Sequence, residues 1–84
     1  MKVEIFSGPQ CSYCEQAKQL LQRKGVAFEM LDIAADEKNR EELMRRLPRT
    51  RSLPQIFIGG AHIGSFEDLQ ILDSRGELDG LLEK

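Results

Sequence analysis

Cys11 and Cys14 are the residues of this 84-residue chain whose type and spacing most clearly indicate chemistry. A disulfide between residues this close together closes almost no loop, so it would stabilise the fold little. A structural zinc site usually has four ligands, and His62 is the only histidine that could join the two thiols. Thiol redox chemistry is therefore the favoured interpretation, with half of a metal site and a pair of bystander thiols as the alternatives.

The element that must position the two cysteines is a helix that begins at the pair. Residues 2–6 alternate as in a strand, and the breaker loop Ser7-Gly8-Pro9-Gln10 follows them. Cys11 then stands at or near the N-cap, where unpaired backbone N–H groups and the helix macrodipole favour a thiolate. We expect an exposed Cys11 to be the nucleophile and a more buried Cys14 to resolve the bond. The apolar stripe of this helix has helical spacing and comprises Cys14, Ala17, Leu20 and Leu21.

The remaining elements follow from periodicity and turn residues. The sequence predicts strands at 26–33, 54–58 and 61–63, a helix from 36 to Pro48, a helix after Ser65, and a last short segment from 78 to 82. Asp68 stands three residues after Ser65, which resembles a capping box. A β-α-β unit requires parallel pairing and a hairpin requires antiparallel pairing. We therefore predict an α/β fold in one domain, residues 1–84: a four-stranded mixed sheet flanked by helices in the order β-α-β-α-β-β-α.

Composition excludes several classes of function. The chain has 12 Lys and Arg against 14 Asp and Glu, so it carries no electrostatic footprint for nucleic acid or an acidic membrane. No apolar run approaches the roughly 18 residues of a membrane helix. The first residues contain Glu4 within a short apolar stretch and no small-residue cleavage site, which is unlike a signal peptide. We expect a cytoplasmic monomer that binds neither nucleic acid nor membrane.

The chain resembles a glutaredoxin of the dithiol, Cys-Ser-Tyr-Cys type, similar to small bacterial glutaredoxins, over nearly its whole length. The motifs that carry the resemblance occur in the family's order and spacing: Val3-Glu4-Ile5-Phe6, Cys11-Ser12-Tyr13-Cys14, Ser52-Leu53-Pro54-Gln55-Ile56-Phe57-Ile58, His62-Ile63-Gly64 and Glu67-Asp68-Leu69. The resemblance implies a thioredoxin-like fold with a redox-active centre. It also implies a glutathione-dependent thiol–disulfide oxidoreductase whose partners are glutathione and glutathionylated or disulfide-containing proteins.

The resemblance further implies a glutathione site around the cysteines. Tyr13 is expected to pack beside bound glutathione, and the segment Ser52-Leu53-Pro54 to hold its cysteinyl part, with Leu53 offering its backbone and Pro54 in the cis form. The segment Ser65-Phe66-Glu67 is expected to hold the γ-glutamyl end, since helix N–H groups suit a carboxylate and an acidic side chain suits an ammonium. The alternatives are an unpartnered surface Tyr13, a strand-entry Pro54 and a Phe66 that serves only the core.

Three departures from the family's pattern are visible. Gly8 stands where many relatives have a lysine that stabilises the thiolate and pairs with a carboxylate of glutathione, and Arg40 or Arg51 is the candidate replacement. Ser12 stands where proline is commoner, so its amide and hydroxyl can donate toward the Cys11 sulfur, and we expect a thiolate at least as stable. Ser65 replaces a second glycine. His62 is predicted to be a strand-edge residue without catalytic duty.

An iron–sulfur role is the alternative function. Relatives with this loop include some in which the first cysteine and glutathione bridge a [2Fe–2S] cluster between two subunits, so the alternative that the resemblance implies is a cluster-binding dimer that uses Cys11. The second cysteine, Cys14, favours the oxidoreductase, because dedicated cluster carriers of the family usually lack it. No other metal site is predicted.

Overall fold

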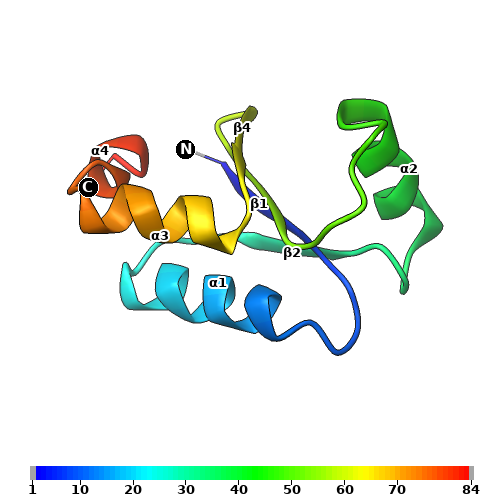
Figure 1. Ribbon diagram of the computed structural model, residues 1–84, viewed down its shortest axis with the longest axis horizontal. Coiled ribbons are helices and arrows are strands. Elements are labelled where there is room, and N and C mark those ends of the chain that lie inside the picture. Colours follow the sequence, from blue (N-terminus) through cyan, green and yellow to red (C-terminus); the bar gives the residue numbers. More distant parts are fainter. Residues whose placement is uncertain (1, 84) are drawn as a thin grey trace.

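The computed structural model describes residues 2–83 and has the predicted order of elements (Figure 1). The strands are β1 (Val3–Ser7), β2 (Glu29–Asp32), β3 (Gln55–Ile58) and β4 (Ala61–Gly64). The helices are α1 (Ser12–Arg23), α2 (Glu37–Arg46), α3 (Phe66–Ser74) and the single turn α4 (Leu78–Leu81), which is the predicted last segment. No helix between residues 2 and 83 is long and apolar enough to cross a bilayer.

The four strands form one mixed sheet in the order β2-β1-β3-β4, as predicted. Strand β1 pairs in parallel with β2 and antiparallel with β3, and β3 pairs antiparallel with β4. Strand β2 is shorter than the predicted 26–33. It is an edge strand whose register with β1 runs only from Glu29 to Asp32, and Met30 within it is 39% exposed. A strand with one partner extends only as far as that partner supplies hydrogen bonds.

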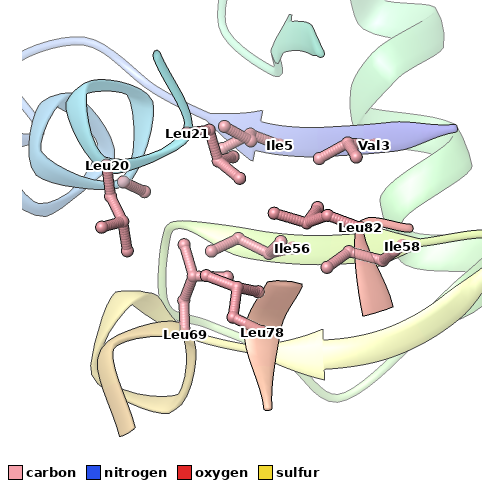
Figure 2. Packing of buried hydrophobic residues seen from close by; sticks show 10 residues of the cluster. Val3, Ile5, Leu20, Leu21, Ile56, Ile58, Leu69, Leu78 and Leu82 are labelled. Carbon is pink, nitrogen blue, oxygen red and sulfur yellow. The ribbon is translucent and has the colours of Figure 1, made fainter. Parts of the chain in front are cut away.

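One face of the sheet is covered by α1, α3 and α4 (Figures 1 and 2). The amphipathic stripe of α1 and the apolar residues of α3 and α4 pack there against alternate residues of β1 and β3. We call this cluster of ten buried residues the α1–α3 core: Val3, Ile5, Ala17, Leu20, Leu21, Ile56, Ile58, Leu69, Leu78 and Leu82.

The other face of the sheet is covered by α2, and its apolar cluster is smaller. We call it the α2 core; its buried members are Phe6, Leu43 and Phe57. The rings of Phe6 and Phe57 meet edge to face with centroids 5.7 Å apart. Strand β1 is central and buried along its whole length, so it fixes the position from which the chain leaves the sheet toward the cysteines.

Candidate active site

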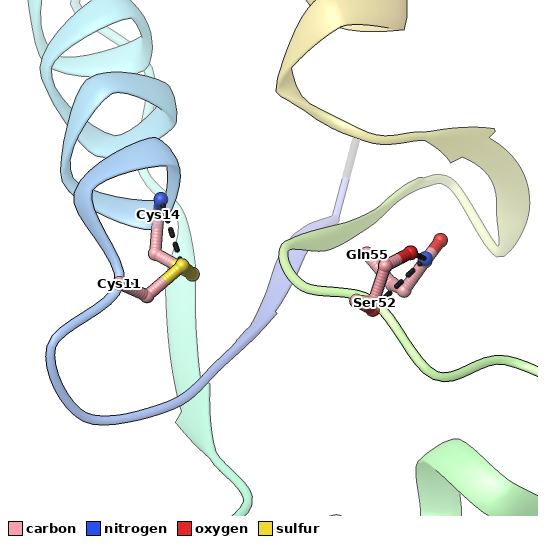
Figure 3. Close-up of a disulfide and its surroundings, with 4 residues drawn as sticks. All are labelled: Cys11, Cys14, Ser52 and Gln55. Carbon is pink, nitrogen blue, oxygen red and sulfur yellow. Dashed lines mark hydrogen bonds between the residues drawn. A yellow bond between two sulfur atoms is a disulfide. The ribbon is translucent and has the colours of Figure 1, made fainter.

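The cysteine pair lies at the start of α1, directly after the loop that leaves β1. Cys11 is the N-cap residue, with extended φ and ψ of −104° and 100°, and its Sγ accepts a hydrogen bond of 3.2 Å from the backbone N–H of Cys14. The two sulfurs form a disulfide, and the Cα atoms are 5.2 Å apart (Figure 3). A helix N–H directed at Cys11 Sγ stabilises negative charge on that atom when the bond is reduced.

The two cysteines differ in exposure. Cys14 is 2% exposed and lies on the buried stripe of α1, whereas Cys11 is half-buried. Because thiol–disulfide exchange requires a thiolate to approach a sulfur, the more accessible Cys11 is the better site for exchange with an external partner. The exposure therefore supports the predicted division of roles between the two residues.

Six of the residues that the sequence assigns to glutathione line one hollow of about 230 Å³. They come from the first turn of α1, from the segment before β3 and from the start of α3, and they are Tyr13, Leu53, Pro54, Ser65, Phe66 and Glu67. The peptide bond between Leu53 and Pro54 is cis, as the resemblance implies. Residues that are far apart in the sequence thus meet at a single concave surface.

Tyr13 and Phe66 form one wall of this hollow. Tyr13 is 61% exposed, and its ring stacks on that of Phe66 with centroids 6.2 Å apart and planes inclined by 27°. Phe66 also packs against the α1–α3 core. Phe66 therefore serves the core, and its contact with a ligand stays a prediction; Tyr13 has an aromatic partner rather than standing alone on the surface.

The N-terminus of α3, which begins at Phe66, also lines the hollow. Ser65 is its N-cap, and the predicted capping box is present: Ser65 N–H donates to Asp68 Oδ2 at 2.9 Å, and Ser65 Oγ accepts from Asp68 N–H. The N–H groups of Phe66 and Glu67 belong to the first turn, so they have no acceptor within the helix. Gly64 has a φ of +124°, and a Cβ there would overlap the Asp68 carboxylate, so glycine is required for this cap.

A larger hollow of about 610 Å³ lies beside the cysteines themselves. Its lining includes Cys11 and Cys14 together with Gly8, Lys18 and Met30. Sequence reasoning did not assign Lys18 to the site, although its spacing of four residues from Cys14 places both on one side of α1. Lys18 Nζ lies 3.8 Å from Glu15 Oε2, so this hollow already contains a cation on the cysteine side of the helix.

The structure also shows where Gly8, which replaces the family's lysine, and the candidate replacement cations lie. A Cβ at Gly8 would lie 2.9 Å from Leu53 Cδ1, so the loop before the cysteines passes close to the segment that precedes Pro54. Arg40 and Arg51 line a separate hollow of about 450 Å³ together with Arg49. They do not line either of the two hollows described above.

Ser52 and Ser12 are placed differently from the other residues that the sequence assigns to the site. Ser52 does not line the hollow at Pro54; its carbonyl and hydroxyl oxygens accept hydrogen bonds from Gln55 Nε2 at 3.1 and 3.2 Å (Figure 3). The hydrogen bond to Cys11 Sγ comes from Cys14 rather than from Ser12. The expectation for Ser12 concerns the reduced thiolate and stays a prediction.

The cluster-binding alternative requires ligands from outside this chain. Among residues 2–83, no group of three or more His, Cys, Asp or Glu side chains lies close enough together to hold a metal ion. A [2Fe–2S] cluster takes four protein or thiol ligands. One chain therefore does not fit the cluster, and the glutathione-bridged dimer stays a prediction.

The sheet order and the cysteine pair, half-buried at the N-cap and buried one turn later, define the class of protein: a thiol–disulfide oxidoreductase with a thioredoxin-like fold. The sequence model of the glutaredoxin family matches residues 3–63. The chain belongs to the glutaredoxin family.

Individual relatives agree with this assignment. The chain is 49% identical over 81 residues to glutaredoxin 3 of Escherichia coli K12, covering 96% of each sequence. The solution structure of a Brucella melitensis glutaredoxin matches with a TM-score of 0.80 at 44% identity, covering 98% of this chain and 88% of that one. A buckwheat glutaredoxin–glutathione complex matches with a TM-score of 0.84 at 25% identity, covering 96% and 76%.

Proposed function

We propose that this oxidoreductase uses glutathione as its reductant and acts on glutathionylated or disulfide-bonded proteins. The observation that carries the proposal is the hollow in which cis-Pro54, Tyr13 and the first turn of α3 meet at the start of the cysteine helix. A hollow of about 230 Å³ suits part of a tripeptide rather than a folded domain. The structural likeness to a buckwheat glutaredoxin whose structure is a complex with glutathione also supports it.

Each part of glutathione has a complementary group in this hollow. The free N–H groups of Phe66 and Glu67 suit the γ-glutamyl carboxylate, because a helix N-terminus attracts anions. The Glu67 side chain suits the neighbouring ammonium. Leu53 offers its backbone to the cysteinyl unit, which brings the glutathione sulfur toward Cys11, and Tyr13 covers the bound peptide from the side.

The exchange begins on reduced enzyme. The Cys11 thiolate attacks the glutathione sulfur of a mixed disulfide; the old S–S bond breaks, and the protein thiolate leaves and takes up a proton. A second glutathione thiolate then attacks the glutathione sulfur on Cys11, which releases oxidised glutathione and restores the Cys11 thiolate. In the dithiol route, Cys14 instead displaces the partner from Cys11 and gives the disulfide seen in the structure.

The proposal includes a monomer that works in a reducing compartment such as the cytoplasm. Exchange needs only one chain and glutathione, and an intracellular glutathione pool supplies the reductant. The cation that replaces the family's lysine is then either Lys18 beside the cysteines or the arginine group formed by Arg40, Arg49 and Arg51.

The test compares Cys14→Ser with Cys11→Ser on a glutathionylated peptide and on a protein disulfide. We expect Cys14→Ser to keep activity on the mixed disulfide and to accumulate glutathione on Cys11, as seen by mass spectrometry, while it loses activity on the protein disulfide. Cys11→Ser is the matched control and loses both activities. Turnover of the wild-type chain that does not depend on glutathione concentration would contradict the proposal.

A further inference from the structure

A network of side-chain hydrogen bonds connects strand β4 to the segment that precedes Pro54. Gln55, the first residue of β3, is 6% exposed. Its Nε2 lies 3.0 Å from Thr50 Oγ1, 3.1 Å from the Ser52 carbonyl oxygen and 3.2 Å from Ser52 Oγ. Its Oε1 lies 2.8 Å from His62 Nε2 on β4. Figure 3 shows the hydrogen bonds between Gln55 and Ser52 in the same view as the disulfide.

The chemistry of the partners fixes which way the Gln55 amide faces. The Ser52 carbonyl can only accept a hydrogen bond, so the NH₂ group of Gln55 must face it. The amide oxygen then faces His62, which must donate from Nε2. In this arrangement a neutral His62 ring carries its proton on Nε2.

His62 itself is held by the sheet. It is the register partner of Phe57 across β3 and β4, and the two rings have centroids 5.1 Å apart with planes inclined by 35°. The ring thus rests on the α2 core while its Nε2 reaches the Gln55 amide. His62 is itself exposed on the edge strand β4, so its position depends on the strand pairing and on the contact with Phe57.

The loop that receives these bonds also packs Leu47 and Leu53 against the α2 core. Residues 47–54, between α2 and β3, form neither helix nor strand; Leu47 N–H donates to Leu43 O at 2.7 Å, and Thr50 N–H donates to Leu47 O at 3.1 Å. The Gln55 amide binds both Thr50 and Ser52 from beneath. The hydrogen bond to the Ser52 carbonyl restrains the residue directly before Leu53.

We propose that Gln55 is a positioning residue that holds Ser52 and Leu53 in the geometry required by the ligand, and that His62 orients Gln55. The inference rests on the proposed function for the identity of the ligand, because Leu53 is expected to bind the cysteinyl unit of glutathione. A preorganised backbone acceptor and donor lowers the ordering cost of binding. Loss of the His62 donor removes the protein partner of the Gln55 amide oxygen and weakens the restraint on the amide, which then rests on its bonds to Thr50 and Ser52.

The first experiment uses the free protein and no glutathione. Nitrogen-15 NMR of the His62 ring is expected to show the Nε2–H tautomer, and backbone relaxation is expected to show lowered order parameters at Ser52 and Leu53 in His62→Phe and Gln55→Met. Phenylalanine keeps the ring against Phe57, and methionine keeps the length of Gln55. An Nδ1–H tautomer, or unchanged order parameters in both variants, would overturn the inference.

The second experiment measures kinetics with a glutathione mixed disulfide. We expect His62→Phe to raise KM about fivefold and Gln55→Met about tenfold, since each loses one or more neutral hydrogen bonds. The value of kcat and the rate at which iodoacetamide alkylates Cys11 should stay within about twofold, because a positioning role leaves the thiolate intact. An equal loss of kcat in both variants would mean a general structural defect and would overturn the inference.

Two further variants separate the possible causes. His62→Gln places an amide donor within reach of Gln55 Oε1, and we expect it to restore KM to within about twofold of wild type. Ala61→Ser, at an exposed neighbouring position on β4, is the matched control and should change nothing. If wild-type turnover proves independent of glutathione, the proposed function fails, while the tautomer and the order parameters still decide the role of His62 and Gln55.

Discussion

The two faces of the sheet are held by different forces. On one face, ten buried apolar residues of the α1–α3 core join three helices to β1 and β3. On the other face, the α2 core has three buried residues, and an ionic cluster supplements them. We call the face with the α1–α3 core, which anchors the cysteine helix, the apolar side. We call the face covered by α2, which depends on charge pairing, the ionic side.

Arg46 is the centre of the ionic cluster. Its Nη1 and Nη2 donate to the two carboxylate oxygens of Glu4 at 2.9 and 3.2 Å, and its Nε donates to Glu42 at 2.6 Å. Its guanidinium also lies over the rings of Phe6 and Phe57, 5.3 and 4.8 Å from their centroids. Glu4 lies on the central strand with its side chain only 7% exposed, so it requires this bidentate partner.

The difference explains how the site is assembled. The cysteines belong to α1, on the apolar side, whereas the loop that enters Pro54 follows α2, on the ionic side. Polar contacts are directional, and apolar packing is not. A loop that must present its backbone at one angle is therefore suited to the side with hydrogen bonds, and a helix that must only be rigid is suited to the apolar side.

The largest expected effect comes from a cavity in the α1–α3 core. Leu21 is fully buried against β1, and Leu21→Ala should lower the free energy of unfolding by about 3 kcal/mol, because it removes apolar contacts and leaves a void. Urea unfolding of the oxidised protein measures this loss. Gln19→Ala, at an exposed position on the same helix, is the control and should change it by less than about 0.5 kcal/mol. Equal effects would show that α1 is not anchored by its apolar stripe.

A smaller effect is expected from the ionic side. Arg46→Met keeps an apolar stem over Phe6 and Phe57 but leaves the buried Glu4 carboxylate without its bidentate partner. We expect a loss of about 2 kcal/mol in the same assay, since Arg46 is partly exposed and water screens part of the interaction.

The control for Arg46→Met is Arg45→Met on the neighbouring position of α2. Arg45 also pairs with Glu42, but its side chain is 70% exposed, so its loss should cost less than about 0.5 kcal/mol. Equal losses for the two variants would show that the Arg46–Glu4 pair stabilises the fold no more than an exposed charge pair does.

The apolar side was the more predictable of the two from sequence. The spacing of Cys14, Ala17 and Leu21 predicts the buried stripe of α1, and the Ser65–Asp68 pair predicts the cap of α3. These patterns are local: a helix brings residues three or four apart onto one face whatever the rest of the chain does. The N-cap position of Cys11 follows from the same argument.

The ionic side was not predictable in this way. From the sequence, Arg46 is a basic residue in the last turn of a helix, where it suits the helix dipole, yet its main partner, Glu4, is 42 positions away. The hydrogen bond between Gln55 and His62 depends on the register of β3 and β4, and a bulge shifts that register between Ile56 and Phe57. Contacts of this kind are set by strand pairing, and no local period encodes them.

The smallest expected effects are those of pH on the free energy of unfolding. Acid and alkali are expected to lower it through different sides of the sheet. Hydrogen bonds from Arg45 and then Arg46 lower the pKa of Glu42 from about 4.5 to about 2. The stability from this group is therefore present above about pH 4.5 and is lost as the pH falls toward 2. On the apolar side, Lys24 at the end of α1 binds Asp73 and Asp79, which raise its pKa. Its contribution is present below pH 10.5 and is lost as the pH rises through the raised value.

Acid should therefore weaken the α2 side, and alkali the contact of α1 with α3 and α4. Glu42→Gln is expected to flatten the dependence of unfolding free energy on pH between about 4.5 and 2, because the variant has no carboxyl to protonate there. Glu41→Gln is the control: it is exposed on the same helix and makes no ion pair with the described residues, so its pH profile should follow the wild type. Since Glu42 is partly exposed, salt should shrink the difference between the two profiles, whereas a slope that Glu42→Gln leaves unchanged would place the acid sensitivity elsewhere.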